Sequence, residues 1–321
     1  MPARKPELAQ TELIESLPVA CASEVEAVNF LEAQRWSGSP KCPECESDNV
    51  YAMRDRATGE RNKRYLWRCR HCSRQFTVRT GTIYEESLVP LRKWLRVLWE
   101  ASTCKNGVSA LEISRKIQVT YKTALFMLHR VRHAMTPNPD GPKLVGVVEA
   151  DETYVGARKP RYPSEKKGRR KGADFTKTPV FAVVQRGGEV RTRVMANVTA
   201  ANVSDALLEN VSPDAHLVTD HLNVYKGVGR PFKSHRSVLH NLRQYVDPND
   251  RTCHTNTVEG FWARVKRKLN GTHHAVSREH LHRYITEAAF IYNTRELNDG
   301  ERTLALIKKT EGKRLRYERP A

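Results

Sequence analysis

The sequence predicts an α/β protein in which a cysteine-rich segment and a helical segment precede a core of strands and helices. Three observations support this fold class. Paired cysteines with short β-like runs occupy residues 40–80, helical periodicity fills residues 88–135, and strand-like apolar runs mixed with helical runs begin at residue 144. The intervening segment TPNPDGPK is dense in proline and glycine, which is typical of a domain boundary.

The net charge favours a polyanionic partner. The 321 residues include 55 Lys and Arg against 36 Asp and Glu, a formal net charge of +19. The candidate partners are nucleic acid and an anionic membrane surface. Nucleic acid is favoured, because the sequence contains no separate basic amphipathic helix that could anchor the protein to a membrane. No apolar run approaches the ~18 residues of a membrane span, and the N-terminus lacks the apolar core of a signal peptide. A cytoplasmic protein is therefore expected.

Three further segments complete the predicted organisation. Residues 1–36 are expected to carry one helix, SEVEAVNFLEAQRW, and residues 299–321 to form a basic C-terminal tail. Residues 156–178 are rich in Lys and Arg and predict a mobile basic loop. The loop residues expected to contact DNA are Lys166, Lys167, Arg169, Arg170 and Lys171.

The paired cysteines predict a zinc ribbon over residues 37–82. Two C-x-x-C pairs, separated by 23 residues, supply Cys42, Cys45, Cys69 and Cys72. Four thiolates at the corners of a tetrahedron suit Zn²⁺, and a site with four protein ligands is structural because it leaves no position open for chemistry. The alternatives are four unligated thiols or a redox pair, but a thioredoxin-like context is absent. His71, inside the second pair, is interpreted as a bystander.

Residues 88–136 are predicted to contain a helix-turn-helix. Ser109 and Glu112 have the spacing of a capping box, a turn is expected at Gln118, and Thr120 can cap a second helix. The inward positions of the second helix are Leu125, Leu128 and Val131. Its polar residues that could meet DNA are Lys122, His129, Arg130 and Arg132. The alternative is an ordinary helical pair that bridges two domains.

Acidic residues end two strands of the predicted core, 144–298. In LVGVVEADETYVG, two-residue alternation puts Glu149 and Asp151 on one face and Glu152 on the other. The strand in HLVTDHLNVY runs directly into Asp220. Each acid alone is equally consistent with a strand end, a turn or a helix cap.

A third carboxylate lies on an amphipathic helix, HTNTVEGFWARVKRK. Its apolar stripe consists of Val258, Phe261, Trp262, Val265 and Leu269. Glu259 and Lys266 lie at the rim of this stripe, although Asn256 and Glu259 also have capping-box spacing. Two strand-end carboxylates with a helical glutamate packed across them could hold two Mg²⁺ ions roughly 4 Å apart, as in phosphodiester chemistry.

The chain resembles the DDE transposases of bacterial insertion sequences, in the zinc-ribbon family related to eukaryotic Merlin elements. The resemblance covers residues 25–298 and rests on the ribbon, the helix-turn-helix, ADETYVG, TDHLNVY, and a final block from NTVEGFW to YNTR. It implies an RNase H-like core, a mixed sheet with flanking helices. It also implies Mg²⁺- or Mn²⁺-dependent cleavage and joining of double-stranded DNA at inverted repeats, in the bacterial cytoplasm at the nucleoid, by a homodimer or larger assembly.

The resemblance implies site residues as well. The catalytic acids and Mg²⁺ ligands fall on Asp151, Asp220 and Glu259, with Lys266 as the basic residue seven positions later and Arg264 as a DNA contact. Some members of the family have Asn in the third position, and Asn256 lies about 60° from Glu259 on a helical wheel. Glu259 is preferred because a carboxylate neutralises Mg²⁺ better than an amide does. Glu149 is a minor candidate for an additional acidic role.

Two competing functions remain open at this point. One is a nuclease of the same fold that hydrolyses DNA without joining it. The other is a zinc-ribbon DNA-binding regulator whose transposase-derived core is inactive, which the presence of all three acids argues against. No G-x-S-x-G or G-x-x-x-x-G-K-[ST] motif occurs, so serine-hydrolase and P-loop ATPase functions have no local support.

Overall fold

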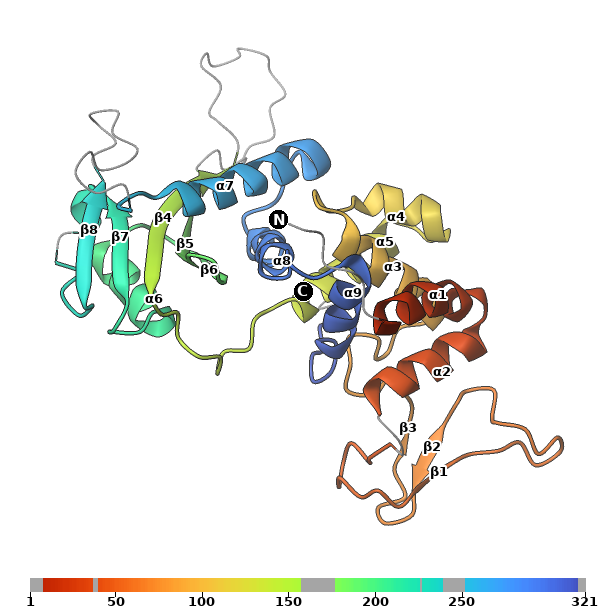
Figure 1. Ribbon diagram of the computed structural model, residues 1–321. Coiled ribbons are helices and arrows are strands. Elements are labelled where there is room, and N and C mark those ends of the chain that lie inside the picture. The colour runs from red at the N-terminus through yellow and green to blue at the C-terminus, as the bar shows by residue number, and fades with distance from the viewer. Residues whose placement is uncertain (1–7, 37–39, 157–176, 226, 239–251, 317–321) are drawn as a thin grey trace, which may run out of the picture. The chain divides into compact units, whose positions relative to one another are not determined.

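The computed structural model describes residues 8–36, 40–156, 177–225, 227–238 and 252–316. Two compact units make up the chain (Figure 1). The first comprises Met1–Thr136 with Glu296–Ala321, and the second comprises Pro137–Arg295. The chain thus enters the second unit in the Pro- and Gly-rich segment. Across the described ranges, every helix is too short or too polar to span a membrane.

Six helices of the described residues belong to the first unit. They are α1 (Leu8–Ala22), α2 (Glu24–Arg35), α3 (Leu91–Thr103), α4 (Ala110–Ile117), α5 (Tyr121–Ala134) and α9 (Asp299–Lys308). Helix α3 buries Leu91, Trp94, Leu95 and Leu98 against its neighbours, while its remaining face is polar. This one-sided burial is the stabilising arrangement for an amphipathic helix in a helical layer.

Two predictions for the chain ends are wrong. One helix was expected in residues 1–36, but the described part of this segment contains two, α1 and α2. The expected helix is α2, and the additional helix α1 contains Pro18. The C-terminal residues do not begin as a tail. Asn298 and Glu301 form a reciprocal capping box, and α9 then buries Thr303 and Leu306 in the first unit.

The cysteine-rich segment forms a small antiparallel sheet in the first unit. Its strands β1 (Val50–Ala52), β2 (Trp67–Cys69) and β3 (Gln75–Phe76) are adjacent in that order. Glu32 of α2 joins this sheet to the helices, because its carboxylate accepts from Trp67 Nε1 at 2.8 Å and from Arg61 Nη1 at 2.9 Å. The ribbon therefore has a fixed attachment to α2.

Among its described residues, the second unit contains a five-stranded mixed sheet. Its strands are β4 (Val147–Val155), β5 (Thr178–Gln185), β6 (Val190–Val194), β7 (His216–Asp220) and β8 (Ser234–Val238). The spatial order is β6-β5-β4-β7-β8, with β6, β5 and β4 antiparallel and β4, β7 and β8 parallel. This is the RNase H-like arrangement, so the predicted α/β fold class is confirmed.

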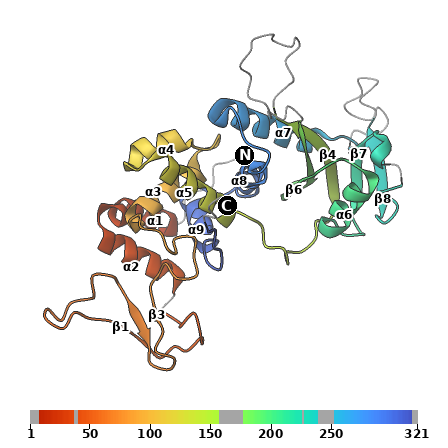
Figure 2. The same ribbon diagram turned by 180° about the vertical axis from the view of Figure 1, so that it is seen from behind.

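Helices cover both faces of this sheet (Figures 1 and 2). On one face, α6 (Ala200–Asn210) and the 3₁₀ turn η1 (Asn223–Tyr225) pack against alternate β4 residues, Val148 and Ala150. On the other, α7 (Asn256–Lys268), the π-helical turn η3 (Leu269–His273) and α8 (Leu281–Asn293) cover Val180, Ala182 and Val184 of β5. Strand β5 is buried on both sides, which explains its continuous apolar sequence.

Candidate active site and metal centre

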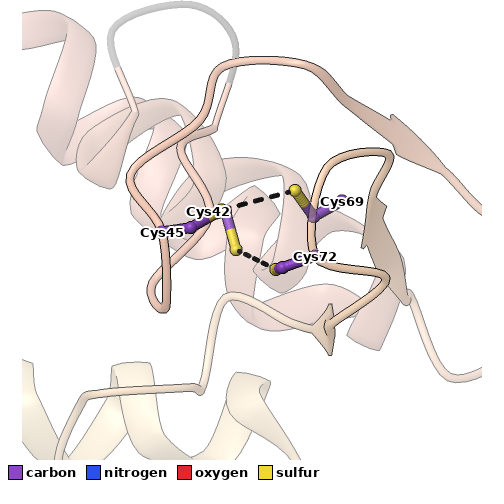
Figure 3. A group of neighbouring side chains, drawn as sticks. All are labelled: Cys42, Cys45, Cys69 and Cys72. Carbon is purple, nitrogen blue, oxygen red and sulfur yellow. Dashed lines mark hydrogen bonds between the residues drawn. The ribbon is translucent and has the colours of Figure 1, made fainter.

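The four ribbon cysteines form one compact cluster. All four Sγ atoms lie within 4.8 Å of one another. Cys42 and Cys45 project from the loop before β1, Cys69 ends β2, and Cys72 follows it (Figure 3). The Sγ atoms are 3.5 Å apart for Cys42 and Cys72 and 3.7 Å apart for Cys45 and Cys69. Tetrahedral Zn–S bonds of about 2.3 Å would set the sulfurs about 3.8 Å apart, so the cluster has the dimensions that Zn²⁺ requires.

The surroundings of the cluster also fit a cation. Backbone N–H groups of Cys72 and His71 donate to Cys69 Sγ and lower the pKa of this thiol to about 6, which favours its thiolate. Burial and hydrogen bonds to the neighbouring thiols raise the pKa of Cys45 and Cys72 instead. Beside the cluster, the ring of Trp36 meets the edges of Trp67 and Phe76 at centroid distances of 6.0 and 6.1 Å. The cysteine pairs therefore rest on their own small apolar core.

The acids of β4 and β7 are brought to the same level of the sheet. The two strands are parallel, with Glu149 opposite Val218. This is the last pair of the ladder, and Asp151 and Asp220 follow it by two residues on each strand, so alternation turns both toward the face of Glu149 and Val218. The negative charge of Asp220 acts on Asp151, which agrees with this placement. Asp151 is also directly opposite Ala182 of β5, which packs beneath α7. Both strand acids therefore face α7.

Glu259 lies in the first turn of α7, over this edge of the sheet. Its Oε1 accepts from Thr255 Oγ1 at 3.1 Å. Burial, together with the negative charges of Glu152, Asp220 and Glu259, raises the pKa of Asp151 to about 7. Asp220 and Glu259 are thus each near enough to act on Asp151, although among the described residues only the four cysteines have all their ligand atoms within 4.8 Å of one another. A divalent cation among the three carboxylates would offset their negative charges, so the donor set suits Mg²⁺ or Mn²⁺.

Neighbouring acids have other partners. Glu152 points to the opposite face, as alternation predicts, and the buried Tyr225 hydroxyl donates to its Oε2 at 2.5 Å. Glu149 is fully buried on the α7 face. Its carboxylate accepts from Thr257 N at 2.8 Å, Val258 N at 3.0 Å and Arg186 Nε at 2.6 Å. Sequence reasoning missed Arg186 and Tyr225, because no local motif marks either residue.

The helix cap proposed for Asn256 and Glu259 is absent. Thr255 is the N-cap of α7 and makes no side-chain capping bond, and Asn256 is the first helical residue and is exposed. Asp220 does not cap an α-helix, because its Oδ1 accepts from Leu222 N at 3.2 Å in a turn before η1. The capping-box interpretation of Asn256 and Glu259 is therefore wrong.

Comparisons with known proteins identify the family of this chain. An ISXO2-like transposase domain matches residues 143–293, and a transposase zinc-ribbon domain matches residues 22–75. An uncharacterised protein in the transposable element ISH50 of Halobacterium salinarum is 30% identical over 273 residues, 82% of this chain and 88% of that protein. The chain belongs to the family of ISXO2-like transposases.

Solved structures are more distantly similar to this ISXO2-like family member. The Mos1 transposase paired-end complex with left transposon end is 13% identical, with a TM-score of 0.28 over 64% of this chain and 71% of that one. The simian T-cell lymphotropic virus intasome, in complex with PP2A regulatory subunit B56 gamma, is also 13% identical. Its TM-score is 0.29 over 60% of this chain and 66% of that one.

Both N-cap residues predicted for the helix-turn-helix cap their helices, but only the Ser109 half of the predicted capping box is present. Ser109 Oγ accepts from Glu112 N at 3.1 Å, and Thr120 Oγ1 accepts from Thr123 N at 3.2 Å. Between them, Gln118 ends α4 with a left-handed φ of 52°. The Glu112 carboxylate pairs with Lys116 Nζ at 2.9 Å. Local side-chain to backbone bonds thus set the turn between α4 and α5.

The predicted DNA contacts divide into three groups. Lys122 on α5 and Arg264 and Lys266 on α7 are exposed. The prediction is wrong for Arg130 and Arg132, which are 5% and 2% exposed, and His129 is buried with them. Arg130 Nη1 donates to the carbonyls of Ile83 at 2.7 Å and Glu85 at 2.8 Å, so this guanidinium holds the first unit together. The loop residues Lys166, Lys167, Arg169, Arg170 and Lys171 lie outside the described residues.

Proposed function

We propose that this protein is an insertion-sequence transposase that binds the terminal inverted repeats of its element and catalyses Mg²⁺-dependent strand cleavage and strand transfer. The observation that supports the proposal is that Asp151 on β4 feels the negative charges of both Asp220 on β7 and Glu259 on α7. Membership of a transposase family supports the same reaction class. The zinc ribbon and helix-turn-helix serve recognition in this proposal.

The residues of the site have separate roles in the proposed reaction. Asp151 and Asp220 supply carboxylate oxygens from adjacent strands, and Glu259 supplies a third from α7. These three carboxylates would hold two Mg²⁺ ions, which would supply activation of the attacking water or 3′-hydroxyl and stabilisation of the leaving oxygen. Lys266 is exposed two turns after Glu259 on the same helix and is proposed to contact a DNA phosphate near the reacting end.

A basic hollow in the first unit is proposed to contact the DNA backbone. Its volume is about 260 Å³, and four cationic side chains line it: Arg92, Lys93, Arg96 and Lys116. Lys116 pairs with Glu100 at 2.7 Å, and Arg96 Nε lies 3.9 Å from the same carboxylate. The two exposed arginines of α3 are proposed as the main phosphate ligands, because a guanidinium can bind a phosphate through two N–H groups. With Lys122 on α5, this surface takes over the role that the sequence assigned to Arg130 and Arg132. DNA contacts by residues 156–178, and assembly as a dimer or larger oligomer on DNA, stay predictions.

One experiment separates the proposed function from its competitors. Purified protein is incubated with Mg²⁺ and labelled DNA that carries the inverted repeats flanking the gene, together with a target plasmid. A transposase exposes the 3′-hydroxyl at the element ends and joins it to the target. Cleavage without joining would indicate a hydrolytic nuclease, and binding without metal-dependent nicking would indicate an inactive regulator.

The ribbon should hold one structural Zn²⁺ per chain. Cys42→Ser removes one of four ligands from the cluster, so we expect loss of zinc and local unfolding of the ribbon. Elemental analysis should find about one zinc per chain in the wild type. The second unit should keep its folded hydrogen-exchange pattern, because its sheet has separate cores. Wild-type protein without stoichiometric zinc would contradict this assignment.

Neutralising the basic hollow should weaken the salt dependence of DNA binding. Removing one phosphate-binding side chain lowers the slope of log K against log[salt] by about 0.9, so Arg92→Ala with Arg96→Ala should lower it by up to about 1.8. Affinity should fall similarly for specific and unrelated DNA. Lys308→Ala, an exposed lysine on α9, is the matched control and should leave the slope unchanged. An unchanged slope in the double variant would exclude the hollow as a phosphate site.

A further inference from the structure

The N-terminus of α7 is fastened to the sheet by a buried carboxylate. Glu149, in the interior of β4, is 0% exposed. Its Oε2 accepts from the backbone N–H groups of Thr257 and Val258, at 2.8 and 3.0 Å, and its Oε1 accepts from Thr257 Oγ1 at 2.9 Å. These are N–H groups that a helix start leaves without an internal partner. A residue of another element therefore performs the capping that Thr255 does not.

Arg186 binds both Glu149 and the residues that immediately precede α7. Its Nε donates to Glu149 Oε1 at 2.6 Å, and its Nη1 and Nη2 donate to the carbonyls of Thr252 at 2.6 Å and His254 at 2.7 Å. One ion pair thus binds the carbonyls before α7 and the N–H groups at its start. Charged hydrogen bonds of this kind are among the stronger and more directional ones, and a carboxylate at a helix N-terminus is further favoured by the helix dipole.

This ion pair connects directly to the candidate active site. Glu149 and Asp151 lie two residues apart on β4 and face the same side of the sheet. Val258, whose N–H Glu149 accepts, precedes Glu259. We propose that Glu149 and Arg186 form a clamp that sets Glu259 against Asp151 and Asp220, so that both are positioning residues for metal binding. The inference rests on the proposed function, and it assigns the clamp no contact with metal or DNA.

The alternative is that the clamp only attaches α7 to the sheet and does not position the metal ligands. A second ion pair, at the C-terminal end of α7, serves as a control that distinguishes these two roles. Lys268 Nζ lies 2.9 Å from Glu287 Oε2 of α8, and both side chains are nearly completely buried. In the clamp, Glu149 is fully buried and Arg186 is 21% exposed. Removing one partner of either pair should destabilise the protein. Only the clamp lies beside Glu259, whereas Lys268 is at the last turn of α7.

The test compares Glu149→Gln and Arg186→Gln with Glu287→Gln in the full-length, zinc-loaded protein. Mn²⁺ binding is measured by titration calorimetry without DNA, the Mg²⁺ concentration for half-maximal end cleavage is measured separately, and the melting temperature monitors stability. Loss of an outer-shell partner typically weakens metal affinity by about 10- to 100-fold. We expect both clamp variants to weaken Mn²⁺ binding by about tenfold or more. Glu287→Gln should lower the melting temperature with Mn²⁺ affinity within about twofold of wild type.

Each outcome decides the question. Equal Mn²⁺ affinity in all four proteins, or equal loss in Glu287→Gln and the clamp variants, would overturn the clamp. If Glu149→Gln does not fold, Arg186→Gln decides alone, because it leaves the Glu149 bonds to Thr257 and Val258 in place. Asp220→Asn in the same titration distinguishes failure of the clamp from failure of the proposed function. Unchanged Mn²⁺ binding in Asp220→Asn would remove the metal site itself.

Discussion

Asp220→Asn is expected to abolish Mg²⁺-dependent cleavage and joining while leaving affinity for the terminal repeats near that of the wild type. Asp220 ends β7, at the level of Asp151 on β4, where an amide of the same shape cannot supply the negative charge that Mg²⁺ needs. We expect activity to fall by about 10³-fold or more, beyond the 10- to 100-fold typical of an outer-shell partner. Asp151→Asn should behave alike.

The measurement is the cleavage and strand-transfer assay, with binding followed by gel shift without metal. Asp214→Asn is the matched control, because Asp214 is an exposed carboxylate in the turn before β7 and should tolerate the same change. Full strand-transfer activity in Asp220→Asn would end the two-metal account of this site. Loss of end binding in that variant would indicate that recognition and chemistry are not separate.

Glu259→Gln should lower activity by orders of magnitude with little change in stability. Gln can still accept the hydrogen bond from Thr255 Oγ1, and Glu259 does not form the capping box with Asn256. The cost in free energy of unfolding should therefore stay below the ~1 kcal/mol typical of a lost cap. The assay compares strand transfer and chemical denaturation in Glu259→Gln and Asn256→Ala. If Asn256→Ala is inactive and Glu259→Gln is active, the amide and not the carboxylate is the third ligand.

Features that depend on neighbours in the chain could be predicted from the sequence. The C-x-x-C pairs specify two tight turns, and these place four sulfurs within one metal's reach. The caps at Ser109 and Thr120 are side-chain to backbone bonds over three residues, so their spacing alone indicates them. Strand alternation placed Asp151 and Glu152 on opposite faces because the period of a strand is two residues.

Features that depend on distant contacts could not be predicted. A helical wheel places Arg130 on the polar face of its helix, which predicts exposure. The side chain is buried because it donates to the carbonyls of Ile83 and Glu85, and these belong to a segment outside that helix. Pro18 disfavours α1 because proline removes a helical hydrogen bond, yet tertiary packing retains the helix. Helix α9 is an exception, because the spacing of Asn298 and Glu301 is a local signal that could have indicated it. Glu149 was a minor candidate for an acidic role at the active site. Its partners, Arg186 and the first N–H groups of α7, are far from it in the sequence and could not be predicted.

The position of the bound metal decides whether Asp151, Asp220 and Glu259 form the active site. Crystals of the protein with its cognate DNA ends and Mn²⁺ would be measured at the manganese absorption edge, where anomalous difference peaks locate the ion. The account predicts peaks bounded by Asp151, Asp220 and Glu259, and their loss in Asp220→Asn. Two results would contradict this metal site: no peak at these carboxylates at saturating Mn²⁺, or a peak at Glu149 in their place.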